Sequence, residues 1–349
     1  MAKHKIFLVH GMGKHPKGWS EPVQELLREC YGRYKGLKLL PFEQNFQFVE
    51  VCYDRHFDDL RKRWAKAAGE VVGLIKGAGL EDSFAGTLAG WAEEADKDDF
   101  LRTHVLDVVL YRLAATVGEE VRSSVIDQIM SSLNPGNDVL RWSVLAHSLG
   151  TAVAHDSLLE LFTRKKGGLK PEEHGLEVLM MVANVSRVLE DPSLYKYDVY
   201  RSIVRPSSSP GDGICRHYLN ARHECDPVAK PKMFKPAESW PDPQARADGN
   251  YANLEIGIIE AANVHDFEHY LRNPKVHIEL FRRLTAPGLI DKDAARDAEA
   301  GHAANSPIGK FKQEVDGLKK LSLADEEDNW NLILTMMRDY MDSFGSKNS

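Results

Sequence analysis

Cysteine is scarce in this 349-residue chain, and the four cysteines lie far apart with no C-x-x-C pair among them. A chain of this length buries enough surface to fold without cross-links, so reduced thiols are expected rather than a disulfide framework. The apolar run near the N-terminus is too short for a signal peptide, and no run approaches the roughly 18 apolar residues of a membrane span. These absences predict a cytoplasmic protein with no transmembrane segment.

The 45 lysines and arginines are outnumbered by the 52 aspartates and glutamates. The formal net charge is −7, and the short basic runs at 61–63 and 164–166 form no continuous basic stripe. Nucleic-acid binding depends on such a stripe because it neutralises backbone phosphates. We therefore expect no nucleic-acid partner.

What the chain does contain is a series of short apolar runs alternating with segments of helical spacing. Continuous apolar runs are typical of strands buried on both faces of a parallel sheet, and helices connect such strands by right-handed crossovers. The chain therefore predicts an α/β fold with a mainly parallel central sheet flanked by helices. The expected strands are 6–9, 46–53, 139–146, 176–182, 214–219 and 254–259, and the clearest helices are 21–34 and 149–162.

Two segments do not fit a minimal α/β unit. A long helical stretch separates the second and third strands, and we interpret residues about 56–133 as a helical cap insertion. After residue 285 the chain becomes polar and then ends with apolar residues at helical spacing. We assign residues 1–285 to the α/β domain, cap included, and residues 286–349 to a polar linker and a C-terminal helical tail. That last helix either docks on the body or forms a homo-oligomer interface.

The strongest chemical motif is Ala146-His147-Ser148-Leu149-Gly150, which follows an expected strand and precedes an expected helix. This is the context of the G-x-S-x-G nucleophile elbow, in which a sharp turn exposes a serine hydroxyl and needs small residues two positions to either side. The motif predicts Ser148 as a nucleophile. The amide of Leu149, at the start of the helix, is placed to stabilise an oxyanion.

A second glycine-rich loop, His10-Gly11-Met12-Gly13, follows the first expected strand. Acyl transfer needs two amide donors for the oxyanion, and Met12, between two glycines, is the candidate for the second one. The same loop could bind phosphate, but it has neither the P-loop spacing nor the third Rossmann glycine. Nucleotide binding is therefore the weaker interpretation.

A serine nucleophile needs a base and an acid, which follow it in the chain order Ser, Asp or Glu, His. Asp226 comes after the fifth expected strand, and His265 comes after the sixth. His269 is the alternative base, although it falls inside the helix that follows. The segment His265-Asp266-Phe267-Glu268-His269 also places two histidines on one helix face, but it departs from H-E-x-x-H and has no evident third ligand. We expect no metal and no cofactor.

The chain as far as about residue 284 resembles the α/β-hydrolase superfamily, in its serine esterase and lipase branch. The V-H-G-M-G loop, the A-H-S-L-G-T elbow and the D-P-V turn carry this resemblance. It implies cleavage of a carboxylic ester by Ser148, His265 and Asp226 through an acyl-enzyme, with a small-molecule or lipid ester as the substrate. A thioesterase or acyltransferase with the same triad, and a non-catalytic interaction module, remain alternatives.

Overall fold

A computed structural model describes residues 3–11, 15–56, 115–133, 141–164, 167–187, 198–209, 211–226, 229, 233–259 and 264–306. Six strands form one sheet: β1 (His4–Val9), β2 (Phe46–Val51), β3 (Trp142–His147), β4 (Leu176–Val182), β5 (Cys215–His223) and β6 (Tyr251–Ile256). Their order is β2-β1-β3-β4-β5-β6, and each neighbouring pair is parallel. The predicted α/β architecture, with a mainly parallel sheet and flanking helices, is confirmed.

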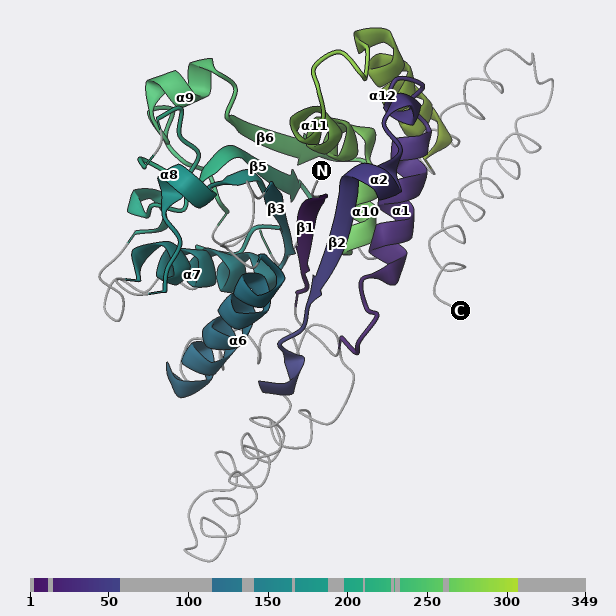
Figure 1. Ribbon diagram of the computed structural model, residues 1–349. Coiled ribbons are helices and arrows are strands. Elements are labelled where there is room, and N and C mark those ends of the chain that lie inside the picture. Colours follow the sequence, from purple (N-terminus) through teal and green to yellow (C-terminus); the bar gives the residue numbers. More distant parts are fainter. Residues whose placement is uncertain are drawn as a thin grey trace, which may run out of the picture.

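Helices cover both faces of this sheet, as Figure 1 shows. One face carries α6 (Ala115–Leu133) and α7 (Leu149–Thr163), and the other carries α1 (Glu21–Gly32), α10 (Phe267–Arg272) and α11 (Pro274–Leu284). The shorter helical pieces are η1 (Leu37–Leu39), α2 (Phe42–Asn45), α8 (Pro171–His174), η2 (Val199–Arg201) and α9 (Pro243–Ala247). Alternate residues of each strand serve the two faces: Phe7 and Val9 pack with α6 and α7, whereas Ile6 and Leu8 pack with α1 and α11. Burial on both faces explains why β1, β3 and β4 are largely continuous apolar runs rather than alternating ones.

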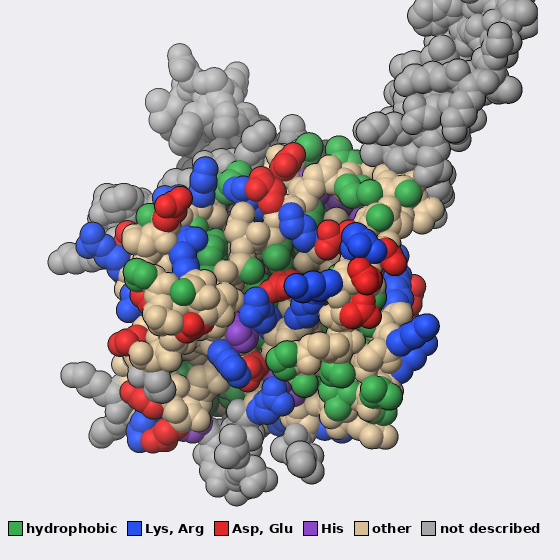
Figure 2. All heavy atoms as spheres, turned by 90° about the horizontal axis from the view of Figure 1, so that it is seen from above, with side chains coloured by type: hydrophobic (Ala, Val, Ile, Leu, Met, Phe, Trp, Pro, Cys, Tyr) green, Lys and Arg blue, Asp and Glu red, His purple; other side chains and the backbone are tan. Residues whose placement is uncertain are grey.

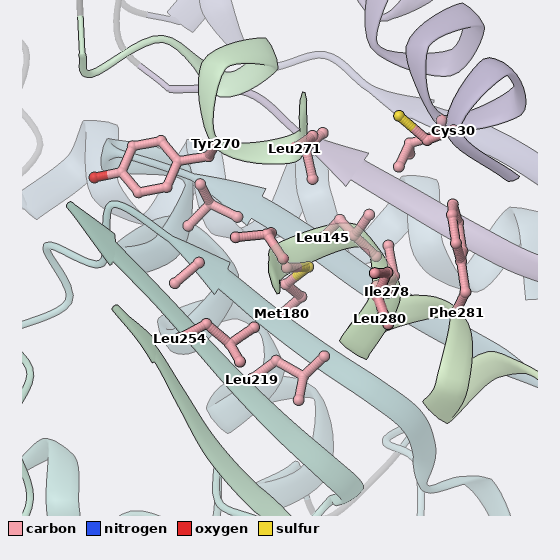
Figure 3. Close-up of a cluster of buried hydrophobic side chains, with 14 of the residues drawn as sticks. Cys30, Leu145, Met180, Leu219, Leu254, Tyr270, Leu271, Ile278, Leu280 and Phe281 are labelled. Carbon is pink, nitrogen blue, oxygen red and sulfur yellow. The ribbon is translucent and has the colours of Figure 1, made fainter. Parts of the chain in front are cut away.

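The second of these cores reaches the edge of the sheet where the strands end. Figure 3 shows Leu145, Met180 and Leu219 from the sheet against the helical residues Leu271 and Phe281. Tyr270 lies at one end of the cluster, and its hydroxyl points away from the aliphatic side chains. The ring therefore packs in the core, while its buried oxygen points out of the aliphatic cluster.

The structure differs from the sequence prediction in two helical regions. Residues 115–133, which we assigned to the cap, form α6, and α6 packs against α7 and β2 as part of the layer on one sheet face. The rest of the predicted cap, 57–114, lies outside the described residues. Residues 292–305, assigned to a polar linker, form helix α12 (Lys292–Asn305), which packs on α11 with Ala295 buried. Most of the surface of α12 faces solvent, so its residues are mainly polar and lack the apolar spacing by which a helix is predicted.

Three further observations bear on the sequence predictions. All four cysteines are free. None of the described helices is both long enough and apolar enough to cross a membrane. The apolar C-terminal segment that we considered for a homo-oligomer interface lies beyond residue 306, outside the described residues.

The winding of the sheet reverses between β1 and β3. From β1 the chain passes to β2 on one side, and it returns to place β3 on the other side, followed outward by β4, β5 and β6. In doubly wound sheets, ligands bind outside the carboxyl ends of the strands at such a reversal. Residues that follow β1 and β3 are therefore the first place to look for a site.

Candidate active site

Ser148 occupies the sharp turn between β3 and α7. Its backbone has φ 53° and ψ −127°, a left-handed conformation that is rare for a residue with a side chain. Strain of this kind costs about 1–3 kcal/mol and persists only where surrounding contacts impose it. Here the Ser148 N–H donates to the Val182 carbonyl of β4 at 3.0 Å, and the Thr151 hydroxyl donates to the Ser148 carbonyl at 2.6 Å. Both contacts fix the turn to rigid elements.

Two glycines allow the chain to pack closely around this turn. A Cβ on Gly150 would lie 2.0 Å from the carbonyl oxygen of His10, a distance that no real contact reaches. A Cβ on Gly11 would lie 2.8 Å from the Cβ of Ser148. The loop after β1 and the turn after β3 are therefore in direct contact, at the point where the winding of the sheet reverses.

The structure brings together the three residues that the sequence assigned to a triad. The Oγ of Ser148 lies 2.8 Å from Nε2 of His265, and Nδ1 of His265 lies 2.8 Å from Oδ2 of Asp226. All three side chains are buried; Ser148 is 1% exposed, whereas the elbow motif predicts an exposed hydroxyl. The hydrogen-bond network assigns the imidazole proton to Nδ1, which donates to the carboxylate and leaves Nε2 to accept from the serine hydroxyl.

The carboxylate of Asp226 has two further donors. The Tyr270 hydroxyl donates to the same Oδ2 at 2.7 Å, and the Ala229 N–H donates to Oδ1 at 3.3 Å. The Tyr270 oxygen also accepts the backbone N–H of His223 at 3.0 Å, so it is fixed from both sides. Burial raises the pKa of Tyr270 well above its usual value, which keeps this hydroxyl protonated as a donor. Tyr270 is not among the residues that the sequence assigned to the site.

His147, next to the serine, also contacts the base. Its Nε2–H donates to the backbone carbonyl of His265 at 2.6 Å, and its ring stacks on Phe267 with centroids 5.0 Å apart. Burial lowers the pKa of His147 well below its usual value, so the ring is neutral near pH 7. The sequence analysis gave His147 no role. Its place beside Ser148 in the elbow was the only signal available.

The alternative base, His269, lies elsewhere. It belongs to α10, where its ring lies 5.4 Å from that of His223, and burial lowers its pKa to about 4. Both ring nitrogens of His265 already contact Asp226 and Ser148. The structure therefore places His265, not His269, beside the serine, and it gives the two histidines no shared site.

Of the two amides expected to face an oxyanion, the structure describes one. Leu149 is the first residue of α7, where the leading N–H groups of a helix have no intrahelical acceptor. Met12 lies outside the described residues, although its neighbour Gly11 lies against Ser148.

A separate groove of about 1220 Å³ lies at the opposite edge of the sheet, where the strands begin. Figure 2 looks onto this edge, and both basic and acidic side chains lie there. The lining includes His4, Leu176, Glu177, Arg216 and Arg283. The groove contains none of the triad residues, so we do not assign it to the candidate active site.

Comparisons of the chain with protein-family models, curated proteins and solved structures find no match. The assignment of this site therefore depends on its own geometry.

Proposed function

We propose that this protein is a serine hydrolase of the α/β-hydrolase fold, which cleaves a carboxylic ester through Ser148, His265 and Asp226. The observation that carries the proposal is the chain of two 2.8 Å hydrogen bonds from the serine through the imidazole to the carboxylate. Nucleophile, base and orienting acid within hydrogen-bond reach are the recognised signature of an activated serine. The strained turn at Ser148 supports the same conclusion because strain concentrates at functional sites.

The positions of the site residues at the ends of the strands also support the assignment. The glycine loop that follows β1 and the serine that follows β3 are neighbours across the winding reversal, where such sheets bind ligands. Asp226 follows β5 and His265 follows β6, in the chain order Ser, Asp, His of this fold. In the part of the chain that the structure describes, the strand order is β2-β1-β3-β4-β5-β6, which is not the order of the full family sheet.

In the proposed reaction, the Ser148 oxygen attacks the ester carbonyl while His265 Nε2 takes its proton. Asp226 stabilises the imidazolium that results. The negative charge on the tetrahedral intermediate is shared by the Leu149 N–H and, in our proposal, by that of Met12. His265 then returns the proton to the departing alcohol, which leaves an acyl-Ser148. Water repeats the sequence, releasing the acid and restoring the serine.

The test combines a fluorophosphonate probe with turnover of a panel of carboxylic esters. Replacing Ser148 with alanine is expected to abolish labelling and to lower turnover about 10³-fold or more. Ser157→Ala is the matched control, because Ser157 is a buried serine farther along α7 whose hydroxyl has no hydrogen-bond partner in the described part of the chain. It should label and turn over like the wild type.

Two results would overturn the proposal. Full activity in Ser148→Ala would remove the serine from the chemistry. A wild-type protein that neither labels nor cleaves any ester or thioester would instead indicate a non-catalytic interaction module. Faster cleavage of acyl thioesters, or acyl transfer to added alcohols, would keep the triad and change the substrate class.

A further inference from the structure

A cluster of three ligand-type side chains lies beside the proposed active site and takes no part in the triad. His10 directly follows β1, Asp54 follows β2, and His15 returns from the loop after β1. Each offers one nitrogen or oxygen, and these three atoms all lie within 4.8 Å of one another. Parallel pairing of β1 with β2, which places Val9 opposite Val51, brings the two strand ends together.

The separations within the cluster fit a bound ion. Nε2 of His10 lies 3.3 Å from Oδ1 of Asp54, and Nδ1 of His15 lies 3.4 Å from Oδ2. Ligands bound at about 2.0–2.2 Å to a tetrahedral Zn²⁺ lie roughly 3.3–3.5 Å from one another. One carboxylate oxygen faces each imidazole, so the carboxylate can hold a shared ion with either oxygen or with both.

The surroundings of His10 resemble the outer shell of a metal ligand. Nδ1 of His10 contacts the Gly11 carbonyl at 2.8 Å, and a proton donated there leaves the Nε2 lone pair directed at Asp54. Histidines that bind metals commonly donate their other N–H to a carbonyl or carboxylate in this way. The Tyr53 ring stacks on His10 at 4.0 Å, and its hydroxyl donates to the His10 carbonyl at 2.6 Å. The Tyr53 N–H competes weakly for Nε2, at 3.5 Å.

His15 supplies the route by which an ion can enter. Its side chain is 24% exposed, whereas His10 is fully enclosed. The two imidazoles are stacked, with centroids 4.2 Å apart and an angle of 18° between planes. Coordination in the plane of both rings requires the His15 ring to rotate out of this stack.

We propose that His10, His15 and Asp54 form a binding site for a divalent first-row transition-metal ion, with Zn²⁺ as the best match. Two imidazoles and one carboxylate are a recurrent ligand set for such ions, with the remaining position open to water. The ion would connect His10 to His15, the two ends of the segment that carries Met12. Its role is to hold the glycine loop, and the proposal does not depend on the chemistry at Ser148.

The test measures binding directly, with untagged full-length protein. Metal-free protein is titrated with Zn²⁺ by calorimetry, and with Co²⁺ by its visible absorption, whose intensity reports tetrahedral coordination. We expect one ion per chain. Asp54→Asn and His15→Ala should each weaken binding at least about 10-fold, by analogy with the loss caused by removing an outer-shell partner. His56→Ala is the matched control, since His56 lies close in sequence but faces Glu120 at 3.5 Å.

Two outcomes would refute the site: no stoichiometric binding, or binding that survives both Asp54→Asn and His15→Ala. Either would reduce the cluster to direct contacts of Asp54 with His10 and His15. Thermal unfolding of each variant establishes that it is folded. If Asp54→Asn does not fold, the more exposed His15→Ala decides the result. Fluorophosphonate labelling of Ser148, measured on the same samples, separates failure of this proposal from failure of the hydrolase assignment.

Discussion

The hydroxyl of Tyr270 provides the sharpest test of how the proposed acid is held. Tyr270→Phe removes a 2.7 Å hydrogen bond to Oδ2 of Asp226 and leaves the ring, which packs in the core, in place. It also deprives the buried N–H of His223 of its acceptor at 3.0 Å. The change thus removes one oxygen that connects the end of β5 to the carboxylate beside the base.

The magnitude follows from these contacts. Hydrogen bonds to charged groups contribute about 1.5–3 kcal/mol, so we expect the free energy of unfolding to fall by roughly 2–3 kcal/mol. Two effects on kcat oppose each other. Without the hydroxyl, the carboxylate of Asp226 is held less firmly, which lowers kcat. Its negative charge is also no longer shared with a hydrogen-bond donor, which raises kcat. We expect the restraint to dominate, because Oδ2 of Asp226 is the same atom that orients His265. An orientation loss of about 1.4 kcal/mol lowers kcat about tenfold.

The assay is steady-state hydrolysis of the best ester found in the panel, together with urea unfolding. A positioning role predicts a lower kcat with an unchanged KM. Tyr34→Phe is the control, because it removes another buried hydroxyl, which lies 2.8 Å from Nε2 of His277. It should lose stability without losing kcat. An unchanged or raised kcat in Tyr270→Phe, with the expected loss of stability, would refute the reasoning.

Two further predictions concern stability. Ser148→Gly should be more stable than Ser148→Ala by on the order of 1 kcal/mol in urea unfolding, because glycine relieves about 1–3 kcal/mol of strain and gives back about 0.4–1 kcal/mol in the unfolded chain. Equal stabilities would mean that the turn is not strained. Burial lowers the pKa of His217, His269 and His277 to about 4. The unfolded chain therefore binds protons that the folded chain does not, and stability should fall as the pH drops from about 6.5 towards 4, by up to about 1.4 kcal/mol per pH unit for each histidine. A free energy of unfolding that does not change between pH 6.5 and pH 4 would contradict this prediction.

The strands were predictable to the extent that burial on both faces dictates their composition. The fourth strand matches its predicted range of 176–182, because both faces require apolar residues there. The fifth strand continues to His223, past the predicted end at 219, although its last residues are polar. Asn220 explains this extension: its side chain hydrogen-bonds Asn184 and Asn253 on either side. Such cross-strand pairing cannot be seen in a single segment.

The sixth strand illustrates the same limit. It was expected at 254–259 and lies at 251–256, three residues earlier. Its position is set by pairing with β5, where Tyr218 lies opposite Tyr251 and His223 lies opposite Ile256. The apolar residues that suggested the later range continue past Ile256, which is the last residue of β6 paired with β5. Register between strands, not local composition, decided the boundary.

Part of the candidate site was likewise predictable from the sequence, and part was not. The turn at Ser148 was predictable because its requirements are local: a buried strand, a small residue two positions to either side and a helix that follows. Asp226 and His265 required only chain order and strand ends. Tyr270 and His147 were not predictable, because their importance lies in distances of 2.7 Å and 2.6 Å to residues far away in sequence. No periodicity or motif encodes such distances.

The two proposals meet at one backbone contact. Gly150, at the start of α7, packs against the carbonyl of His10, and Gly11 packs against the Cβ of Ser148. The imidazole of His10 is in turn fixed by Tyr53 and directed at Asp54. A shift of His10 would therefore reach the serine turn through a single residue, because close-packed backbone transmits displacement rather than absorbing it. This contact gives a physical reason why an ion at His10, His15 and Asp54 would influence the proposed nucleophile without touching the substrate.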